Sequence, residues 1–348
     1  MERRNNFDLL RLMAAVSVIF SHAFLLAENS QDHDPLMIAT GGQTILGLVG
    51  VFIFFTISGY LITQSFDTSR TPLIFLAKRA LRIFPGLVVC LFVCVFVVGP
   101  LTTTLPLSEY FALPQPYLFL AHNAVLDVVF NRLPGVVFGP GNAGGIVNGP
   151  LWSLPCEALL YLLLCGLGML RLLTLPVGLV LLALGMICLW VDTSGDTPGG
   201  TGWLLGFFAA GICCYRLRGP RLAEPRLALL ALAGLILGAA LHAFVVAFPI
   251  CGGYLTIFAA TYPRFRALPA ARFGDLSYGL YIYGWPVEQC IVYFAGPGVR
   301  WWEVFGAALA VTLAIAWLSW HGVEKRFRLS ALIGRRAVRV EAEVAAGS

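Results

Sequence analysis

Apolar segments long enough to cross a bilayer recur along the whole chain, and they restrict its possible folds more than any other feature. A transmembrane helix needs about 20 apolar residues, and a segment in lipid must satisfy its backbone polar groups, which only helices and closed barrels achieve. Because the apolar runs are long and unbroken, we expect an all-α, polytopic membrane protein with about ten transmembrane helices. The predicted helices lie near residues 8–27, 43–65, 83–103, 151–170, 175–192, 201–217, 225–245, 247–262, 274–294 and 302–320.

The composition supports this class and excludes a water-soluble enzyme. Of the 348 residues, 59% are hydrophobic and 12% are charged, whereas an ordinary soluble domain has roughly 25% charged residues. All nine cysteines fall inside predicted helices and lack the spacing of a metal site or a disulfide framework. They are interpreted as small buried apolar residues, and no metal is expected.

The Lys and Arg residues gather on one side of the predicted bundle, as they do in the cytoplasmic loops of membrane proteins. With the N-terminus in the cytoplasm, the alternation of ten helices places all 23 of them on that side except Arg132 and Arg300. The cytoplasmic segments are then 1–11, 66–82, 171–174, 216–226, 263–273 and 321–348. Both termini are therefore expected in the cytoplasm. The net charge of +5 indicates orientation rather than a nucleic-acid partner.

No segment is polar and long enough for a separate soluble domain. We expect one membrane domain over residues 1–330 and a cytoplasmic tail of mixed charge over residues 331–348. The largest external segment is 104–150, and its part 131–150 has nine Gly or Pro residues, a composition that disfavours regular helix or strand. Two interpretations of this loop stay open: a cap over a cavity, or a plain connector.

Arg11 and His22 are candidate functional residues of the first helix. They are eleven residues apart, so at about 100° per residue they lie within roughly 20° of the same helix face, about 16 Å apart along its axis. Ionisable groups inside a bilayer usually face a protein interior or a wet cavity, often for function. His22 is equally compatible with a hydrogen bond between helices, and Arg11 with a side chain that extends to the inner interface.

A second cluster of charges, Lys78, Arg79 and Arg82, lies in the predicted inner loop just before Pro85. Arg79 and Arg82 are three residues apart, so on a helix they point the same way. Guanidinium groups suit phosphate recognition, and a nucleotide-like cytoplasmic donor is one interpretation. The other is a simple excess of positive charge on the inner side. Pro85 is typical of the first turn of a helix.

Glu157 is the carboxylate predicted to lie at the depth of His22. It follows Trp152 and Ser153, where the fourth helix begins at the outer surface. A carboxylate there would orient a catalytic imidazole, and leaving it buried and unpaired would cost free energy. His22 is the best-placed partner, although a backbone amide or a protonated carboxyl satisfies the same requirement.

The remaining motifs are aromatic and small residues, which favour helix packing. They comprise the Gly50 to Tyr60 stretch of the second helix and the Ser277-Tyr278-Gly-Leu-Tyr281 stretch of the ninth. Ser58 and Ser277 have no base beside them in the sequence, so no serine nucleophile is predicted.

Taken in order, these segments resemble the membrane acyltransferase 3 family, which O-acylates cell-surface carbohydrates. The likeness covers nearly the whole chain, and five motifs in the right order carry it. They are Asp8-Leu-Leu-Arg11 with His22, Phe54 to Tyr60, Lys78-Arg79 with Arg82-Ile83 and Pro85, Trp152-Ser-Leu with Glu157, and Ser277-Tyr278-Gly-Leu-Tyr281. One departure is Gly284, where many relatives have a histidine.

The resemblance implies an O-acyltransferase in the bacterial inner membrane. It implies that acetyl-CoA, or another acyl-CoA, is the donor and that a glycan, free or lipid-linked, is the acceptor, with membrane lipids as the surrounding partner. His22 would be catalytic, supported by Arg11 and Glu157. The donor phosphates would lie on Lys78, Arg79 and Arg82. The substrate contacts would be Trp152, Ser153, Tyr278 and Tyr281.

Two other classes of function remain compatible with the residues. In a proton-coupled transporter or exporter of a small anion or acylated metabolite, His22 and Glu157 would be a proton relay. In a scaffold without an active site, both residues would be replaceable without effect.

Overall fold

The computed structural model describes residues 6–138, 145–192, 200–262 and 274–327, and the regular structure of these residues is helical. An isolated antiparallel bridge joins Thr103 and Val136, and the described residues form no strand. The all-α prediction is thus confirmed. In this described part of the chain, five helical segments are long and apolar enough to cross a membrane. They are Phe7–Glu28, Leu46–Asp67, Pro72–Thr102, Gly149–Met169 and Trp301–Phe327.

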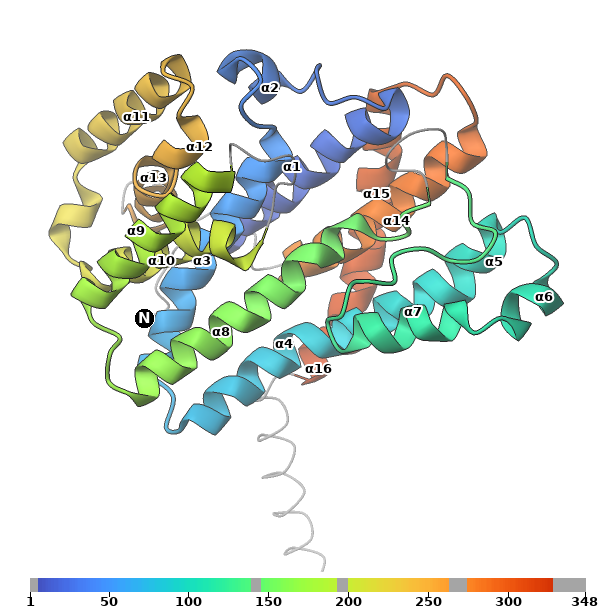
Figure 1. Cartoon of the computed structure of the whole chain (residues 1–348), viewed down its shortest axis with the longest axis horizontal. Helices are drawn as coiled ribbons and strands as arrows, with labels where there is room; N and C mark the ends of the chain where they lie inside the picture. Colours follow the sequence, from blue (N-terminus) through green and yellow to red (C-terminus); the bar gives the residue numbers. More distant parts are fainter. Residues whose placement is uncertain (1–5, 139–144, 193–199, 263–273, 328–348) are drawn as a thin grey trace, which may run out of the picture.

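Each of the ten predicted ranges overlaps one long helix (Figure 1). These are α1 (Phe7–Glu28), α3 (Leu46–Asp67), α4 (Pro72–Val93), α8 (Ser153–Met169), α9 (Leu175–Asp192), α10 (Thr201–Arg216), α11 (Pro225–Ala240), α13 (Cys251–Thr261), α14 (Ser277–Ala295) and α15 (Trp301–Ser319). The shorter elements are α2 (Pro35–Thr40), α5 (Gly99–Thr102), α6 (Leu107–Ala112), α7 (Gln115–Ala124), α12 (Phe244–Ala247), α16 (Lys325–Phe327), the π-helical turns η1 (Cys94–Val98) and η5 (Trp320–Glu324), and the 3-10 turns η2 (Gly149–Trp152) and η3 (Pro220–Ala223). The tail after residue 330 lies outside the described residues.

The third long helix begins earlier than the hydropathy suggests. Thr71 caps α4 by accepting a hydrogen bond from the Ile74 amide at 3.2 Å, and Pro72 occupies the first turn. Pro85 lies inside α4 rather than at its start, so its assignment to a helix beginning was wrong. Hydropathy predicts a loop at Lys78, Arg79 and Arg82 because charged residues lower the average, but the structure places all three within α4.

Helices α1, α4 and α14 run in one direction, and α3, α8 and α15 run in the other. The start of α3 meets the end of α1, where the Gly47 amide donates to Ser21 Oγ at 2.7 Å. Helices α4 and α14 are parallel. Tyr278 near the start of α14 donates to the Ile83 carbonyl of α4, and Cys90, further along α4, donates to the Ile282 carbonyl, further along α14. These directions are the ones that the predicted alternation of helices requires.

Two glycines let the central helices approach closely. A Cβ added at Gly59 on α3 would clash with the Phe208 carbonyl of α10, and one at Gly211 would clash with the Thr56 carbonyl of α3. Phe52 stacks on Phe207 at 3.9 Å between ring centroids beside this contact. Of the predicted packing surface of the second helix, Gly59 and Tyr60 therefore lie at the α3 and α10 interface, whereas Gly50 packs on Ala14 and Ser17 of α1.

The segment 104–150, predicted to be external, contains α6 and α7, which lie with α5 at one end of the molecule (Figure 1). Its described glycine-rich part has no helix or strand before Gly149, as predicted. The Ile146 carbonyl accepts hydrogen bonds from Trp285 Nε1 at 2.9 Å and Gln289 Nε2 at 3.2 Å. Since Val147 is also buried, this stretch packs on α14 rather than extending away from it.

Candidate active site

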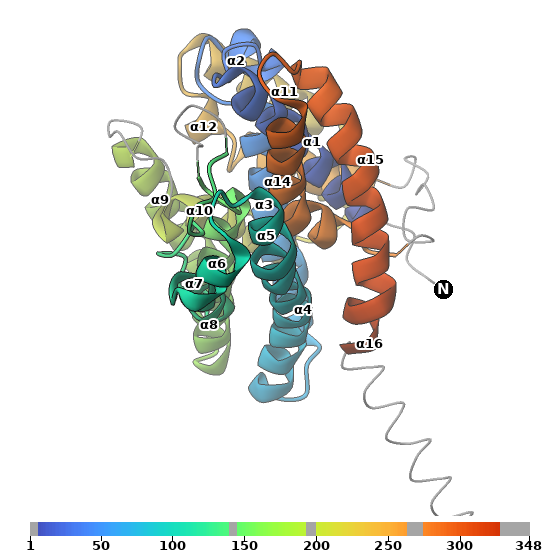
Figure 2. The same cartoon turned by 90° about the vertical axis from the view of Figure 1, so that its right-hand side faces the viewer.

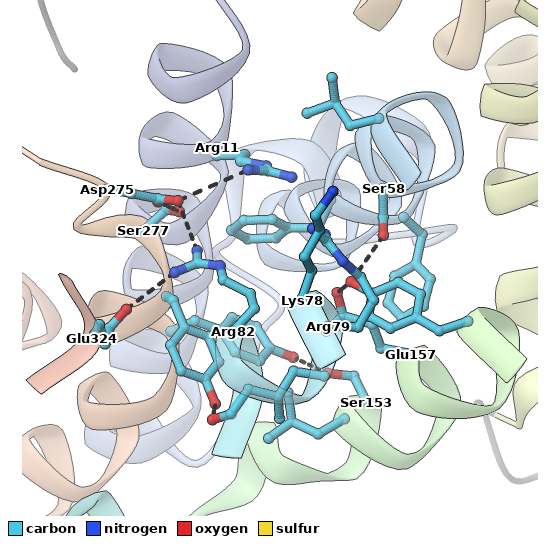
Figure 3. Close-up of a pocket in the computed structure, with 18 of the residues that line it drawn as sticks. Arg11, Ser58, Lys78, Arg79, Arg82, Ser153, Glu157, Asp275, Ser277 and Glu324 are labelled. Atoms are coloured by element: carbon cyan, nitrogen blue, oxygen red, sulfur yellow. Dashed lines mark hydrogen bonds and ion pairs between the residues drawn. The ribbon is translucent and has the colours of Figure 1, made fainter. Parts of the chain in front are cut away.

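A cavity of about 420 Å³ lies where α1, α3, α4, α8, α14 and η5 meet (Figure 3). It brings together charged residues that are far apart in the sequence. Its charged lining residues are Arg11, Lys78, Arg79, Arg82, Glu157, Asp275 and Glu324. Of the other predicted site residues, Ser153, Tyr278 and Tyr281 also line it. His22 and Trp152 are not among the lining residues.

Arg82 is held between two carboxylates. Its Nη2 lies 2.8 Å from Asp275 Oδ2, and its Nη1 lies 3.1 Å from Glu324 Oε2. The guanidinium also lies over the Tyr278 ring, 5.1 Å from its centroid. Arg11 reaches the same Asp275 oxygen from α1, but at 3.9 Å, which is too long for a hydrogen bond. Figure 3 shows this network along one side of the cavity.

The sequence analysis did not identify Asp275 or Glu324 as site residues. Asp275 precedes the ninth-helix motif, and Glu324 lies in the π-helical turn η5 after α15. No spacing relates either position to Arg82. One sequence feature points to them: a carboxylate inside a membrane is costly unless it is paired, so each of the few carboxylates in this chain is expected to have a cationic or hydrogen-bonding partner.

Arg79 differs from Arg82 in having no carboxylate at ion-pair distance among the described residues. Its guanidinium lies 6.0 Å from the centroid of the Tyr161 ring, and its buried Nε has no hydrogen-bond partner in the described part of the chain. Lys78 donates to Ser69 Oγ at 3.1 Å. Both cations face the cavity from the first half of α4 (Figure 3).

Glu157 accepts a hydrogen bond from the Tyr161 hydroxyl, one turn further along α8. Ser58 on α3 donates to the same hydroxyl at 3.3 Å. The predicted contact between Glu157 and His22 is wrong, because Glu157 lies in the cavity with Tyr161 and His22 has another carboxylate. The depth argument failed because it gave only the height of Glu157 and not the direction in which its side chain points.

The predicted substrate residues of α8 and α14 contact each other. Ser153 Oγ and the Tyr281 hydroxyl are 2.7 Å apart. Tyr278 donates to the Ile83 carbonyl at 2.7 Å and so joins α14 to α4. Ser277 donates to Asp275 Oδ1 at 2.7 Å, which gives this serine a structural partner rather than a catalytic base.

His22 pairs with Glu288 of α14, a residue that the sequence analysis missed. His22 Nδ1 lies 3.4 Å from Glu288 Oε2, and the Glu288 side chain is fully buried. The Trp285 ring meets the imidazole edge-on at 4.8 Å between centroids. Nδ1 and the carboxylate thus lie at ion-pair distance, but neither makes a hydrogen bond among the described residues.

Arg11 and His22 both face α14, as the helical period predicts. Arg11 meets Asp275 just before α14 starts, and His22 meets Glu288 further along it. A Cβ at Gly284 would lie 2.9 Å from Ile19 Cγ1, so α14 lies close against α1 near His22. One helix pair therefore carries the cationic cavity at one end and the imidazole and carboxylate pair at the other.

The position of His22 is supported by its neighbour Ser21 and the buried Asp34. Ser21 Oγ donates to Asp34 Oδ2 and accepts from the Gly47 amide at 2.7 Å. Asp34 also accepts from the Leu36 amide at 2.9 Å and thereby caps α2. This network fixes the C-terminal part of α1 to α2 and α3.

In the described residues, no group of three or more His, Cys, Asp or Glu side chains could hold a metal ion.

Comparisons with known proteins assign this chain to a family. The family of the acyltransferase domain, acyltransferase 3, matches residues 4–321. An O-acetyl transferase from Shigella phage Sf6 is 28% identical over 341 residues, which cover 94% of this chain and 97% of the phage protein. Nodulation protein 10 from Rhizobium leguminosarum bv. viciae is 31% identical over 369 residues, which cover 96% of each protein. No solved structure matches the chain.

The family match spans almost the full chain, including all five motifs from Arg11 to Tyr281. The predicted family and the predicted acyltransferase activity are therefore confirmed, and several apolar helices agree with a membrane location. The chain belongs to the acyltransferase 3 family and is a membrane acyltransferase.

Proposed function

We propose that this enzyme moves an acetyl group from acetyl-CoA on the cytoplasmic side to a hydroxyl group of an extracytoplasmic or lipid-linked glycan, such as O-antigen or exopolysaccharide. The observation that carries the proposal is the α1 and α14 pair. It has a cationic cavity at the Arg11 end and a carboxylate-oriented imidazole at the His22 end. The name of the phage relative supports acetyl as the transferred group.

The proposed topology has ten transmembrane helices in the bacterial inner membrane, with both termini in the cytoplasm. Two independent observations support it. Lys and Arg residues segregate to one side in the sequence, and α1, α4 and α14 run opposite to α3, α8 and α15 (Figures 1 and 2). In this topology Arg11, Lys78 and Arg79 lie at the cytoplasmic end, and His22 lies toward the outside.

The cavity has the size and charge for part of a phosphorylated donor. Its volume lies within the range of about 300–1,000 Å³ that is usual for ligand sites. Arg11, Lys78, Arg79 and Arg82 outnumber the three carboxylates in its lining, so a net positive charge remains. Arginine forks bind phosphate oxygens with strong charge-assisted hydrogen bonds. The phosphates of CoA would supply the missing negative charge.

The proposed chemistry uses His22 Nε2 as the base. It takes the proton of the acceptor hydroxyl as that oxygen attacks the thioester carbonyl. The carbon–sulfur bond then breaks, and the proton passes to the departing thiolate. Glu288 stabilises the imidazolium that forms in between. A transient acyl group on Nε2 would use the same nitrogen, and detection of an acyl-imidazole in single turnover distinguishes that route from direct attack.

The donor must extend from the cavity to the imidazole. Tyr281 lines the cavity and Glu288 pairs with His22, and these residues are seven positions apart on α14, or about 10 Å of helix. Trp285 lies between them in the sequence and contacts His22. The flexible arm of CoA would therefore pass the Trp285 side chain to present its thioester.

The test uses proteoliposomes that contain the purified protein, labelled acetyl-CoA on the cytoplasmic face and a glycan extract on the other. We expect labelled glycan with the wild-type protein and at least about a hundredfold less with His22→Ala, the usual size of a general-base effect. His33→Ala is the matched control, because His33 is exposed and pairs with Glu28 away from the cavity. Equal labelling by wild type and His22→Ala would sink the proposed role of His22. Proton-coupled uptake without consumption of acetyl-CoA would instead indicate a transporter.

A further inference from the structure

We infer that Arg79 and Arg82, although three residues apart on one helix face, have different roles. Arg79 would bind a phosphate of the donor, and Arg82 would be a positioning residue that holds α4 to α14 and η5. The inference rests on the proposed use of acetyl-CoA and divides the donor site between its two adjacent arginines.

Both ends of the Arg82 guanidinium are already occupied. Nη2 contacts Asp275 and Nη1 contacts Glu324, each within hydrogen-bond distance. The Asp275 side chain is 11% exposed and that of Glu324 is 4% exposed. A phosphate that took over Arg82 would remove this cation from two shielded carboxylates and leave Asp275 with the more distant Arg11, at 3.9 Å. Since breaking a buried ion pair leaves an uncompensated charge, phosphate binding at Arg82 is unfavourable.

Each of the two carboxylates also accepts a hydrogen bond from a serine. Ser277 donates to Asp275 Oδ1, so that Oδ2 is left for Arg82. Ser319 donates to Glu324 Oε1 at 3.0 Å, so that Oε2 is left for Arg82. A serine on each carboxylate's own segment therefore binds one oxygen, and the other oxygen contacts the guanidinium. This arrangement is that of a structural clasp joining three parts of the chain.

Arg79, unlike Arg82, lines the cavity without a carboxylate at ion-pair distance among the described residues. Its Nε is buried without a hydrogen-bond partner among the described residues, and the Tyr161 face supports the guanidinium from one side. Glu157, the carboxylate on that side of the cavity, is bonded to the Tyr161 hydroxyl instead. A guanidinium that lines a cavity with a free donor and no carboxylate partner is suited to an incoming anion.

The experiment compares two donors that carry the same thioester arm: acetyl-CoA, and acetyl-pantetheine, which lacks the phosphates and the adenosine of CoA. The measured quantity is the ratio of their kcat/KM values. We expect Arg79→Gln to lower the preference for acetyl-CoA at least about tenfold, mainly through the KM for acetyl-CoA. Arg79→Lys should restore part of this preference, because an ammonium is a cation without the fork geometry.

Arg82→Gln should act differently. It removes the shared cation from Asp275 and Glu324, so we expect less folded protein and slower turnover with both donors but an unchanged ratio. The triple variant Arg82→Met, Asp275→Asn, Glu324→Gln removes the cation and both carboxylates of the clasp together, and it also removes the 3.9 Å ion pair of Arg11 with Asp275. This variant should recover folded protein and keep the donor preference. Arg216→Gln is the matched control, because Arg216 also loses a carboxylate pair, with Asp67, but does not line the cavity.

The outcomes separate the inference from the proposal on which it rests. A wild-type protein that does not prefer acetyl-CoA to acetyl-pantetheine would overturn the CoA-dependent function itself. A wild-type preference that Arg82→Gln or the triple variant abolishes, while Arg79→Gln retains it, would overturn the division of roles. Equal loss of the preference in Arg79→Gln and the triple variant would overturn it as well, because both arginines would then bind the donor.

Discussion

His22 Nδ1 faces Glu288 Oε2 across 3.4 Å, and the imidazole comes from the first long helix while the carboxylate comes from the ninth. Both Glu288 oxygens are buried without a hydrogen-bond partner among the described residues. A buried carboxylate with no polar contact except an imidazole is costly unless that imidazole compensates it. The pair therefore couples the packing of α1 on α14 to the chemistry of His22.

Replacing Glu288 with Gln should impair transfer without removing the side chain's volume. We expect kcat to fall by about 10²–10⁴-fold, because the amide cannot stabilise a charged imidazolium or keep its tautomer. Glu28→Gln is the control, because Glu28 pairs with the exposed His33, and a wild-type kcat for Glu288→Gln would contradict the role given to this carboxylate.

Trp285 should contribute to the free energy of unfolding. Trp285→Ala removes a ring that contacts His22 and donates to the Ile146 carbonyl, so we expect a loss of about 3–5 kcal/mol of stability. Trp285→Phe keeps a ring beside His22 and loses only the hydrogen bond, which should cost about 0.5–1.5 kcal/mol. Thermal unfolding in detergent measures both. Trp302→Ala is the control at an exposed tryptophan, and equal losses at the two positions would contradict the expected packing.

Asp34 should be important for the fold around His22. Asp34→Ala removes the partner of Ser21, the cap of α2 and a contact to the Leu46 amide. A hydrogen bond to a charged group contributes about 1.5–3 kcal/mol, so we expect at least this loss in unfolding measurements. The neighbouring Asp32 is exposed, and Asp32→Ala should change stability little. A wild-type unfolding temperature for Asp34→Ala would contradict the network.

The close contact between α3 and α10 should not tolerate a methyl group. Gly59→Ala would place a Cβ against the Phe208 carbonyl, and backbone atoms cannot yield as a flexible side chain does. Overpacking of this kind costs about 1–3 kcal/mol or more. A Cβ at Gly306 on α15 would meet no neighbouring atom within 4 Å, so Gly306→Ala should be neutral or slightly stabilising. The ratio of folded to aggregated protein in detergent compares the two variants, and similar ratios would count against the tight interface.

The parts of the site that depend on local spacing could be predicted. Arg11 and His22 share a helix face because of the helical period, and Arg79 and Arg82 do so for the same reason. The motif order was sufficient to predict the family. The start of α4 could not be found by hydropathy, because Lys78, Arg79 and Arg82 lower the average, although Thr71 and Pro72 carry an N-terminal signal.

The partners of the charged residues could not be predicted. Glu288 and Glu157 are both single carboxylates in apolar helices, and the sequence indicates a depth for each but no direction. The sequence favours Glu157 as the partner of His22, but in the structure Glu157 accepts a hydrogen bond from Tyr161 in the cavity. The carboxylates of Arg82 come from Asp275 and Glu324, which only the contacts of α4 with α14 and η5 bring together.

The sequence by itself determined the helical class, the family and the faces on which the critical side chains lie, because apolar length, motif order and helical period are local properties. The tertiary structure decided which charge meets which: His22 with Glu288, Arg82 with Asp275 and Glu324, and Arg79 with none of the described carboxylates. The physical reason is that ion pairing depends on distances of a few ångströms across helix interfaces, and those distances are set by how whole helices pack.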